Sequence, residues 1–433
     1  MAYRALAGVS AGNFVEWYDF AVYAYSATVI ADLFFPEGDD TTALLGTLAV
    51  FGVTFLSRPA GGVYFGHLGD RIGRRNTLVI ILLLMGGSTT LIGLLPTYDQ
   101  IGMAAPILLT LLRLCQGFSG GGESSGGATF LSEYAPEGKR GMWSGISNST
   151  QTIPFAVAAI LVLGISTWLD DPSYTGWGWR IPFLIAAPLA LVGLFLRMRL
   201  DDTPVFRKLQ EESSVAVAPI ADVLRNYRRE VAILIGIASL NAVAFYTMSS
   251  YFSTYLQEVV GLSASVALIS NSVALLSYSV LIPIAGLVGD RMGRRRVITV
   301  GALSFVVIAV PGYLVAGTGG LGFAILGQLM LTIPLVTVAS VVAVGQAELF
   351  PAAVRYTGAA LGYNVAYAVF GGTAPFVGQL LVLTTDNRLA PAFYLMVLAA
   401  LALIPIRALP ETSKLSMMRS DNVSVDAGRQ SKV

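Results

Sequence analysis

The stretch of sequence that decides the fold occurs twice in the chain. Residues 66–75 read Gly-His-Leu-Gly-Asp-Arg-Ile-Gly-Arg-Arg, and residues 286–295 read Gly-Leu-Val-Gly-Asp-Arg-Met-Gly-Arg-Arg, an offset of 220 positions. The glycines, the Asp-Arg pair and the final arginines coincide, whereas most of the residues between them differ. A polar motif repeated at about half the length of the chain predicts two homologous halves.

Apolar sequence surrounds both copies of the motif. The chain has 433 residues, of which 55% are hydrophobic and 12% are charged, and its mean hydropathy is +0.70. Soluble domains carry about 25% charged residues, so this chain has roughly half the usual number. A soluble fold has no interior large enough for so much apolar surface, and the composition therefore predicts a membrane protein with several spans.

Twelve stretches contain the roughly 20 mainly apolar residues that a membrane helix needs. They are residues 12–34, 43–66, 77–95, 104–131, 141–163, 179–197, 231–256, 264–288, 297–316, 321–344, 358–383 and 390–406. The alternating pattern of a membrane β-barrel is missing from the sequence. We therefore expect an all-α membrane protein with twelve transmembrane helices in two pseudo-symmetric six-helix bundles.

The repeat and the basic residues predict the domain organisation and the orientation. Of the 27 basic residues, two lie inside spans and two flank spans on one side, and the other 23 lie at the termini or in loops after even-numbered spans. The positive-inside rule then places both termini in the cytoplasm. We expect the protein to lie in the plasma membrane or inner membrane of the cell. The expected units are an N-terminal bundle at 1–200, a cytoplasmic linker at 201–229, a C-terminal bundle at 230–410 and a polar tail at 411–433.

The composition argues against several other functions. Lys and Arg number 27 and Asp and Glu 26, so a net charge of +1 offers no electrostatic basis for binding nucleic acid. The single cysteine, Cys115, and the single histidine, His67, are too few for a disulfide or a Cys/His metal site, and we expect His67 to lie in a loop. We expect no enzyme activity, metal, cofactor or obligate protein partner, and we expect a small-molecule substrate, protons and the lipid bilayer as partners.

Several further motifs carry a family resemblance. The loop Gly-x-x-x-Asp-Arg-x-Gly-Arg-Arg resembles the signature of the major facilitator superfamily. Residues 12–20 (Gly-Asn-Phe-Val-Glu-Trp-Tyr-Asp-Phe), 58–62 (Arg-Pro-Ala-Gly-Gly), 113–119 (Arg-Leu-Cys-Gln-Gly-Phe-Ser) and 177–183 (Trp-Gly-Trp-Arg-Ile-Pro-Phe) are similar to its metabolite:proton symporter family, which includes the proline/glycine betaine transporters and the α-ketoglutarate permeases. The resemblance implies a proton-coupled symporter that works by alternating access.

Five ionisable residues lie inside predicted spans, where they are costly and are therefore candidates for function. They are Glu16, Asp19, Arg58, Arg113 and Glu123. We assign proton coupling to Asp19 and Glu123, with Glu16 as a further candidate, because nearby carboxylates in a low dielectric do not all ionise. Arg58 and Arg113 keep their charge and must face anions, so we expect them to bind a substrate carboxylate. The alternative is that the five form internal ion pairs that only hold helices together.

Polar and aromatic residues on other spans complete the expected substrate site. The candidates are Tyr23, Asn148, Gln151, Tyr246, Tyr251 and Asn364. Aromatic faces hold quaternary ammonium groups, so a betaine-type cation would find partners in Tyr246 or Tyr251. Six glycines between residues 117 and 127 predict close packing of the fourth span against its neighbours.

The repeated motif is expected to gate transport without touching substrate. The gating residues are Gly66, Gly69, Asp70, Arg71, Gly73 and Arg74 in the first copy and Gly286, Gly289, Asp290, Arg291, Gly293 and Arg294 in the second. Asp70 and Asp290 lie at helix boundaries, where a carboxylate accepts hydrogen bonds from a helix N-terminus or an arginine. The family resemblance implies that they latch the outward-facing state.

The sequence leaves the substrate open between a zwitterionic osmolyte, such as proline or glycine betaine, and a dicarboxylate or tricarboxylate such as α-ketoglutarate. Two intramembrane arginines favour carboxylates, and Arg113 stands where the proline/betaine pattern has a lysine by resemblance. Residues 98–102, 105–109 and 394–397 are more similar to the osmolyte transporters. A drug or metabolite efflux antiporter is an alternative, although the fifth span lacks a Gly-Pro-x-x-Gly-Gly pattern, and a non-transporting membrane sensor is another.

Overall fold

A computed structural model describes residues 2–35, 40–72, 74–134, 138–198, 219–350 and 355–414. Within these ranges the chain is helical and contains no β-strand. The first half holds α1 (Ala2–Tyr25), α2 (Ala27–Phe34), α3 (Asp40–Ile72), α4 (Arg74–Leu94), α5 (Tyr98–Ile101), α6 (Ala104–Tyr134), α7 (Arg140–Trp168), α8 (Asp171–Ser173), η1 (Tyr174–Gly178), α9 (Arg180–Leu184) and α10 (Ala186–Met198).

The second half begins with α12 (Pro219–Asn226), a short helix inside the expected linker. It continues with α13 (Arg228–Tyr246), η2 (Thr247–Tyr251), α14 (Phe252–Thr254), η3 (Tyr255–Val259), α15 (Ala264–Met292), α16 (Arg294–Ala316), α17 (Leu321–Glu348), α18 (Arg355–Ala366), η4 (Tyr367–Gly371), α19 (Ala374–Thr385) and α20 (Ala390–Ala408).

All twelve predicted spans coincide with single helices or with two or more helices that follow one another along the chain. In the described part of the chain, nine stretches are long and apolar enough to cross a membrane. The remaining three predicted spans lie on α1 with α2, on α4 and on α6, which are helical but carry charged residues, a shorter apolar run or many glycines. The architecture is that of an all-α membrane protein with two six-helix halves.

The repeated motif is mostly helical, which corrects our expectation of a loop. Helix α3 continues through the first copy to Ile72 and contains His67, and α15 continues through the second copy to Met292. The second copy breaks at Gly293, where φ is +97°, a conformation that glycine adopts without strain. Hydropathy marks only the apolar part of a helix, whereas the helix's own hydrogen bonds let it continue into polar sequence.

Several spans are not single helices, and hydropathy gave no sign of this. The first span bends at Ser26, and the sixth, seventh and eleventh contain the π-helical turns η1, η2, η3 and η4. Single π-turns within α-helices often occur at functional sites. Here η2 follows directly after Tyr246 and η4 begins at Tyr367, and the two tyrosine rings lie 6.0 Å apart between centroids.

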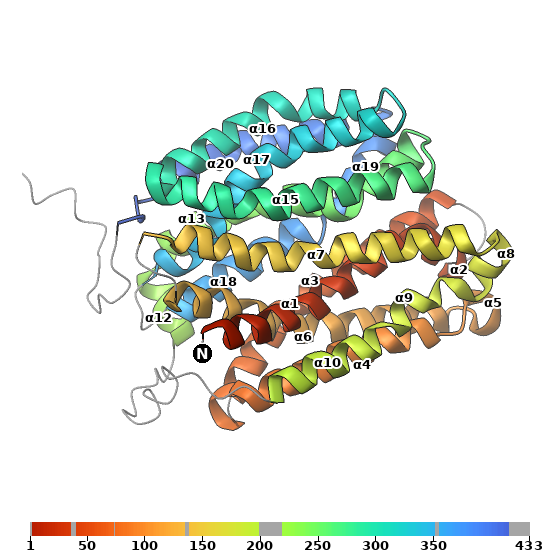
Figure 1. The fold of residues 1–433 in the computed structure, drawn as a ribbon, viewed down its shortest axis with the longest axis horizontal. Helices are drawn as coiled ribbons and strands as arrows, with labels where there is room; N and C mark the ends of the chain where they lie inside the picture. Colours follow the sequence, from red (N-terminus) through yellow and green to blue (C-terminus); the bar gives the residue numbers. More distant parts are fainter. Residues whose placement is uncertain are drawn as a thin grey trace, which may run out of the picture.

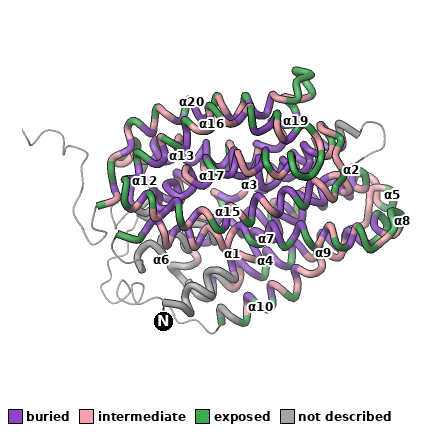
Figure 2. Tube along the Cα trace, turned by 45° about the horizontal axis from the view of Figure 1, so that its top comes forward, coloured by how far each residue is buried: buried purple, intermediate pink, exposed green. Residues whose placement is uncertain are grey.

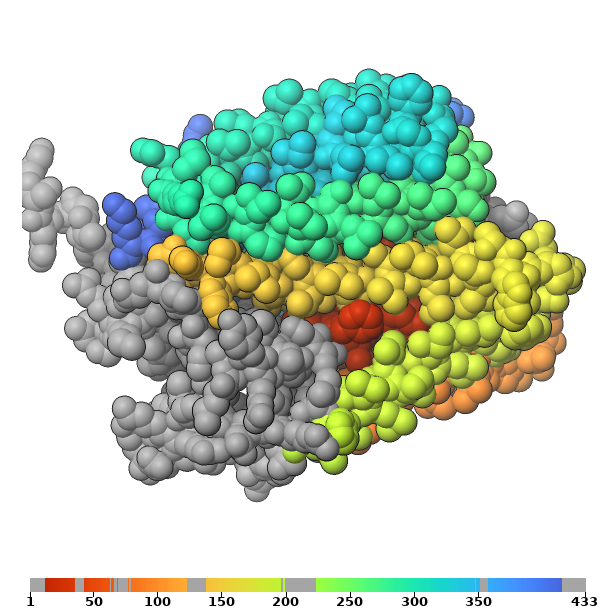
Figure 3. All heavy atoms as spheres, in the orientation of Figure 1, coloured from red at the N-terminus to blue at the C-terminus, as the bar shows by residue number. Residues whose placement is uncertain are grey.

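The two halves pack side by side with their helices running in roughly the same direction (Figure 1). They meet along two lines, where α7 packs on α15 and where α3 packs on η4 and α19. Figure 3 shows the green-to-blue second half lying directly on the yellow α7. Buried residues face the interior of the bundle, and exposed ones follow its outside and its ends (Figure 2). We call the end at which α3 and α15 finish the motif end (left in Figure 1).

Glycines let α3 and α6 touch backbone to backbone, as the run in the fourth span predicts. A Cβ atom on Gly117 would lie 1.6 Å from the carbonyl oxygen of Thr54, and one on Gly121 would lie 1.9 Å from that of Arg58. Neither backbone can move without separating the helices. The contact fixes the distance between α3, which carries Arg58, and α6, which carries Arg113.

Replacing Gly117 with alanine is therefore expected to lower stability by about 1–3 kcal/mol, the usual cost of overpacking. The matched control is Gly164→Ala on α7, because a Cβ there meets nothing within 4 Å and alanine favours a helix over glycine. Thermal unfolding of both variants in detergent measures the difference. Equal midpoints for Gly117→Ala and Gly164→Ala would show that the α3–α6 contact is not tight.

Candidate substrate and proton site

The centre of the first half contains a buried ion pair between α1 and α3. Arg58 donates a hydrogen bond from Nη2 to Oε1 of Glu16, and both side chains are about 1–2% exposed. The same nitrogen lies 3.5 Å from the carbonyl oxygen of Gly120. A guanidinium in a membrane interior is stable only with such partners. In this conformation Arg58 is thus paired with a carboxylate of the protein itself.

Asp19 takes part in a second buried group, which joins three helices. Its Oδ1 accepts hydrogen bonds from Thr89 Oγ1 on α4 at 2.7 Å and from Gln116 Nε2 on α6 at 2.5 Å. The carbonyl oxygen of the Gln116 side chain accepts from Arg113 Nη1 at 3.0 Å. We call Asp19, Thr89, Gln116 and Arg113 the relay group. Gln116 stands between the carboxylate and the guanidinium.

Aromatic rings surround both arginines. The guanidinium carbon of Arg113 lies 4.1 Å from the ring centroid of Tyr23, and that of Arg58 lies 5.4 Å from the ring centroids of Phe20 and Phe55. Ring faces attract cations, most strongly where water is excluded. The rings therefore stabilise the two charges without occupying all of their hydrogen-bond donors.

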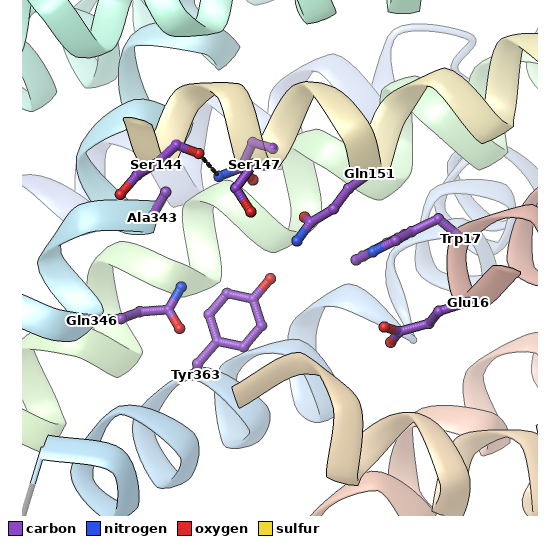
Figure 4. A pocket seen from close by; sticks show the side chains of 9 residues that line it. Glu16, Trp17, Ser144, Ser147, Gln151, Ala343, Gln346 and Tyr363 are labelled. Carbon is purple, nitrogen blue, oxygen red and sulfur yellow. Dashed lines mark hydrogen bonds between the residues drawn. The ribbon is translucent and has the colours of Figure 1, made fainter. Parts of the chain in front are cut away.

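A small polar cavity lies between the two halves, beside the ion pair (Figure 4). About 20 Å³ of it is open to a water-sized sphere, enough for roughly one water molecule. Its walls come from α1, α7, α17 and α18, and they consist of Glu16, Trp17, Ser144, Ser147, Asn148, Gln151, Ala343, Gln346 and Tyr363. The indole nitrogen of Trp17 has no hydrogen-bond acceptor among the described residues. The cavity thus offers two aromatic rings, a carboxylate and several amides.

The expected substrate residues fall into two groups. Asn148 and Gln151 line the cavity, and Tyr23 packs on Arg113. Tyr246 lies behind the cavity, where its ring stacks on Trp17 with centroids 6.2 Å apart. The other two do not line the cavity: Tyr251 donates to Gln379 at 3.0 Å, and Asn364 lies beside Gly62 of α3. Glu123 is on α6, but its side chain lies outside the described residues.

A second set of buried charges closes the motif end. Arg294 donates to Glu348 from Nε and Nη2, both at 3.1 Å, and to Asp290 at 2.8 Å. Arg140, at the start of α7, lies 3.6 Å from Glu348. Asp290 also accepts from the backbone nitrogens of Gly141 and Met142 at 2.9 and 3.1 Å. The expectation that Asp290 binds a helix N-terminus and an arginine is confirmed, whereas its role as a latch stays a prediction.

The segment after the last helix joins the same charges. Thr412 donates to Glu348 at 2.6 Å, and Glu411 accepts from the backbone nitrogens of Arg294 at 2.9 Å and Arg295 at 3.3 Å. Partial burial raises the pKa of the Glu411 carboxyl, but hydrogen bonds from Arg294, Ser413 and Arg295 outweigh it and hold the pKa below its usual value. We call Arg140, Asp290, Arg294, Glu348 and Thr412 the motif-end cluster.

The other gating residues of the second copy lie around this cluster. A Cβ on Gly286 would lie 2.1 Å from the carbonyl oxygen of Gly141, so the backbones of α15 and α7 touch there. A Cβ on Gly289 would lie 3.3 Å from Arg294 and one on Gly293 2.5 Å from Glu411, while Arg291 is exposed. In the first copy, Gly73 lies outside the described residues. The side chains of Asp70, Arg71 and Arg74, and the surroundings of Gly66 and Gly69, lie outside them too.

Sequence reasoning missed Thr89 and Gln116, the two neutral members of the relay group. A signal existed for Gln116, because its spacing of three from Arg113 places both on one face of a helix. Thr89 had none, since a threonine in an apolar span more often donates to the preceding turn. Thr89 is also within 2.9 Å of the Met85 carbonyl oxygen in that turn. Only the packing of α4 on α6 and α1 brings it to Asp19.

Two helical halves in a membrane, with paired charges in the interior and a polar cavity between them, define a solute transporter. A comparison with protein families identifies the kind: the chain belongs to the Major Facilitator Superfamily, whose family profile matches residues 10–375. The protein is accordingly a multi-pass membrane transporter of small molecules and not an enzyme, as the sequence predicts.

Relatives and solved structures agree with this assignment. The chain is 35% identical over 419 residues to the glycine betaine/proline/ectoine/pipecolic acid transporter OusA of Dickeya dadantii. The alignment covers 95% of this chain and 83% of the relative. It is 36% identical over 375 residues to the alpha-ketoglutarate permease of Escherichia coli, or 86% of either chain. The structure of the proton:xylose symporter XylE of E. coli superimposes with a TM-score of 0.75 at 17% identity, over 95% of this chain and 96% of that one, which shows a shared fold.

The motif-end cluster yields a prediction about conformation. Replacing Asp290 with asparagine removes one of the two carboxylates that pair with Arg294 and weakens the hydrogen bonds to the first turn of α7. We expect this to destabilise the closed state by about 1–3 kcal/mol. We expect the motif end to open about tenfold more often. Spin labels at the exposed Lys139 and Arg296, placed in a chain with Cys115→Ser, report this opening as a longer distance between α7 and α16.

The matched control is Asp99→Asn, an exposed aspartate on α5. It is expected to leave the distance distribution unchanged. An unchanged distribution in Asp290→Asn as well would remove the aspartate from the gating role.

Proposed function

We propose that the protein is a proton-coupled symporter that imports a small zwitterionic metabolite with one carboxylate, of the proline and glycine betaine class. The observation that carries the proposal is the composition of the cavity wall. The rings of Trp17 and Tyr363 and the carboxylate of Glu16 suit a quaternary or secondary ammonium. The amides of Gln151 and Gln346 and the indole N–H of Trp17, which has no acceptor among the described residues, offer hydrogen-bond donors to such a substrate.

Charge balance at the centre favours one substrate carboxylate over two. Among the side chains described there, the charges of ionised Asp19 and of Glu16 balance those of Arg58 and Arg113. One proton on Asp19 then leaves a single positive charge, which one carboxylate matches. A dianion would leave one negative charge unmatched in a dry interior, where isolated charges cost several kcal/mol, whereas a zwitterion leaves the positive charge of its ammonium. The ammonium of a zwitterion is faced by rings instead of by another fixed cation.

The relatives support the same class. Several curated relatives are named as transporters of proline or betaine, among them OusA at 35% identity. The resemblance extends over nearly the whole chain and includes the helices that build the cavity. Proton coupling is in keeping with Asp19, the buried carboxylate that the relay group holds next to Arg113.

The position of the cavity relative to the motif end supports transport by alternating access. Ser144 and Gln346 line the cavity, and Arg140 and Glu348 of the motif-end cluster lie close to them on the same helices, α7 and α17. Separating α7 from α15 and α17 at that end would open the cavity there. By the positive-inside rule we place the motif end and both termini on the cytoplasmic side of a bacterial inner membrane.

A dicarboxylate transporter is the second candidate. Two buried arginines in the first half, Arg58 and Arg113, and 36% identity with the alpha-ketoglutarate permease, favour it. It would need a second cation for the second carboxylate, and in this conformation Arg58 is bound by Glu16.

Uptake into proteoliposomes tests the proposal. With an alkaline interior, we expect labelled glycine betaine or proline to accumulate, a protonophore to abolish the accumulation, and α-ketoglutarate not to accumulate. Accumulation of α-ketoglutarate alone would select the second candidate. Extrusion of substrate against an acidic interior would select an antiporter, and no transport across a panel of metabolites would favour a sensor.

Replacing Asp19 with asparagine separates coupling from binding. We expect proton-driven accumulation to be lost, because asparagine does not take up a proton, while exchange of substrate across the membrane continues. Parallel uptake and counterflow assays measure the two processes. Equal loss of both would instead indicate that Asp19 has a structural role.

The aromatic wall predicts a difference between two substitutions of Trp17. Trp17→Leu removes a ring face worth about 0.5–2 kcal/mol to a cation, so the KM for glycine betaine is expected to rise by roughly 2- to 30-fold. Trp17→Phe keeps a ring, and we expect it to retain most of the affinity. Transport kinetics of the pair measure the contribution of the ring, and an equal KM in both variants would contradict cation–π binding.

A further inference from the structure

The relay group contains a side chain whose hydrogen bonds depend on its orientation. Gln116 directs its two N–H bonds to one side, toward Asp19 Oδ1 at 2.5 Å and Thr89 Oγ1 at 3.0 Å. It directs its carbonyl oxygen to the other side, where Arg113 donates at 3.0 Å. The amide is therefore a one-directional bridge that joins an acceptor on α1 to a donor on α6.

This arrangement suits an ionised Asp19, because a proton on its other oxygen, Oδ2, would have no acceptor: Oδ2 has no hydrogen-bond partner among the described residues. The carboxylate oxygen accepts from Thr89 and from Gln116 at once, so it must be an acceptor. A protonated carboxyl carries an O–H that needs an acceptor in turn. Gln116 can supply this acceptor, because rotating its amide by 180° about the last side-chain bond exchanges the positions of its oxygen and nitrogen.

We propose that Gln116 is the element that couples protonation of Asp19 to substrate binding at Arg113, an inference that rests on the proposed proton symport. When Asp19 gains a proton, the amide reverses and its oxygen accepts from the new O–H. Its N–H groups then face Arg113, where two donors meet and the hydrogen bond breaks. Arg113 becomes available to a substrate carboxylate at the moment when the proton arrives.

The geometry of Arg113 suits such a release. In the present state Nη1 is the nitrogen bound to Gln116, and Nε and Nη2 have no hydrogen-bond acceptor among the described residues. A buried guanidinium with unused donors is costly, and the ring of Tyr23 at 4.1 Å compensates only its charge. Loss of the last acceptor would leave a guanidinium that binds an incoming carboxylate strongly.

Among the described side chains around Asp19, Gln116 is the neutral one that contacts both Asp19 and Arg113. On α1 itself Tyr18 and Glu16 are near, and α6 contributes Arg113. The other elements packed against α1 carry further charged or titratable side chains. Those described include Arg140 of α7, bound to Glu348; Arg180 of α9, bound to the carbonyls of Gly93 and Leu95; Asp32 of α2; and Tyr251 of η2, bound to Gln379. The side chains of Arg74 and Arg75 of α4, of Glu123, Glu133 and Tyr134 of α6, and of Arg197 of α10 lie outside the described residues.

The test compares the wild type with Gln116→Met, which keeps the length of the side chain but has neither the N–H donors nor the amide oxygen. In proteoliposomes we expect the wild-type KM for glycine betaine or proline to rise about tenfold as the pH rises from about 5.5 to 8.5, a coupling in the usual range. In Gln116→Met we expect the change over the same interval to fall to about twofold or less, because Arg113 no longer responds to Asp19.

Linkage supplies a second readout that a structural role would not alter selectively. If protons favour substrate, substrate must favour protons by the same factor. Adding substrate to weakly buffered protein in detergent should therefore take up protons in the wild type and not in Gln116→Met. The matched control is Gln328→Met, a fully buried glutamine on α17 that donates to Ser270 at 2.9 Å, and it should behave as the wild type does.

A second variant keeps the inference open to refutation if Gln116→Met folds poorly. Gln116→Glu supplies Arg113 with a charged acceptor that is lost only when the new carboxylate is protonated, so we expect a roughly tenfold weaker substrate affinity than that of the wild type at neutral pH, which recovers at acidic pH. Wild-type pH dependence and proton uptake in folded Gln116→Met, or wild-type affinity at neutral pH in folded Gln116→Glu, would overturn the role of Gln116 and leave proton symport intact. A wild type without proton-driven uptake would overturn both.

Discussion

Matching of buried charges is the constraint on which the rest of the structure depends. In the described centre of the first half, Arg58, Arg113, Glu16 and Asp19 are buried in a helix bundle that spans a membrane, where an isolated charge is costly. The chain meets this cost by placing Glu16 against Arg58 and by linking Asp19 to Arg113 through Gln116. These contacts draw α1, α3, α4 and α6 together. The glycines of α6 are needed because the charges meet only when the backbones touch.

The same principle operates at the motif end, with a different consequence. There, Arg294, Glu348, Asp290 and Arg140 join α15, α16, α17 and α7, and thus the two halves of the chain. The described charges in the centre pair within the first half, so the alternating access that we propose would leave them paired. The charges at the motif end pair across the halves, so opening of that end would separate them. The cavity lies between the two sets, on the helices that carry the second one.

The cavity lies between the buried charges of the first half and the motif-end cluster, and its wall shares residues or helices with both. Glu16 belongs both to the ion pair and to the cavity wall, so a ligand that binds there alters the field around Arg58. Trp17, the next residue, presents its ring to the cavity and stacks on Tyr246 from the second half. Adjacent residues of α1 therefore connect the charges of one half to the aromatic residues of the other.

The sequence by itself determined the membrane class, the two halves, the position of every span and the identity of the intramembrane charges. These follow from hydropathy, from the repeat and from the cost of charge in lipid, all of which are local properties of the chain. The tertiary structure decided which carboxylate binds which arginine and that Thr89 and Gln116 complete the relay group. It also decided that Trp17 and Tyr363 line the cavity while Tyr246 lies behind it. These depend on contacts between distant residues, such as Asp19 and Gln116 at 97 positions apart, whose rotation about each helix axis is set by packing and not by the local sequence.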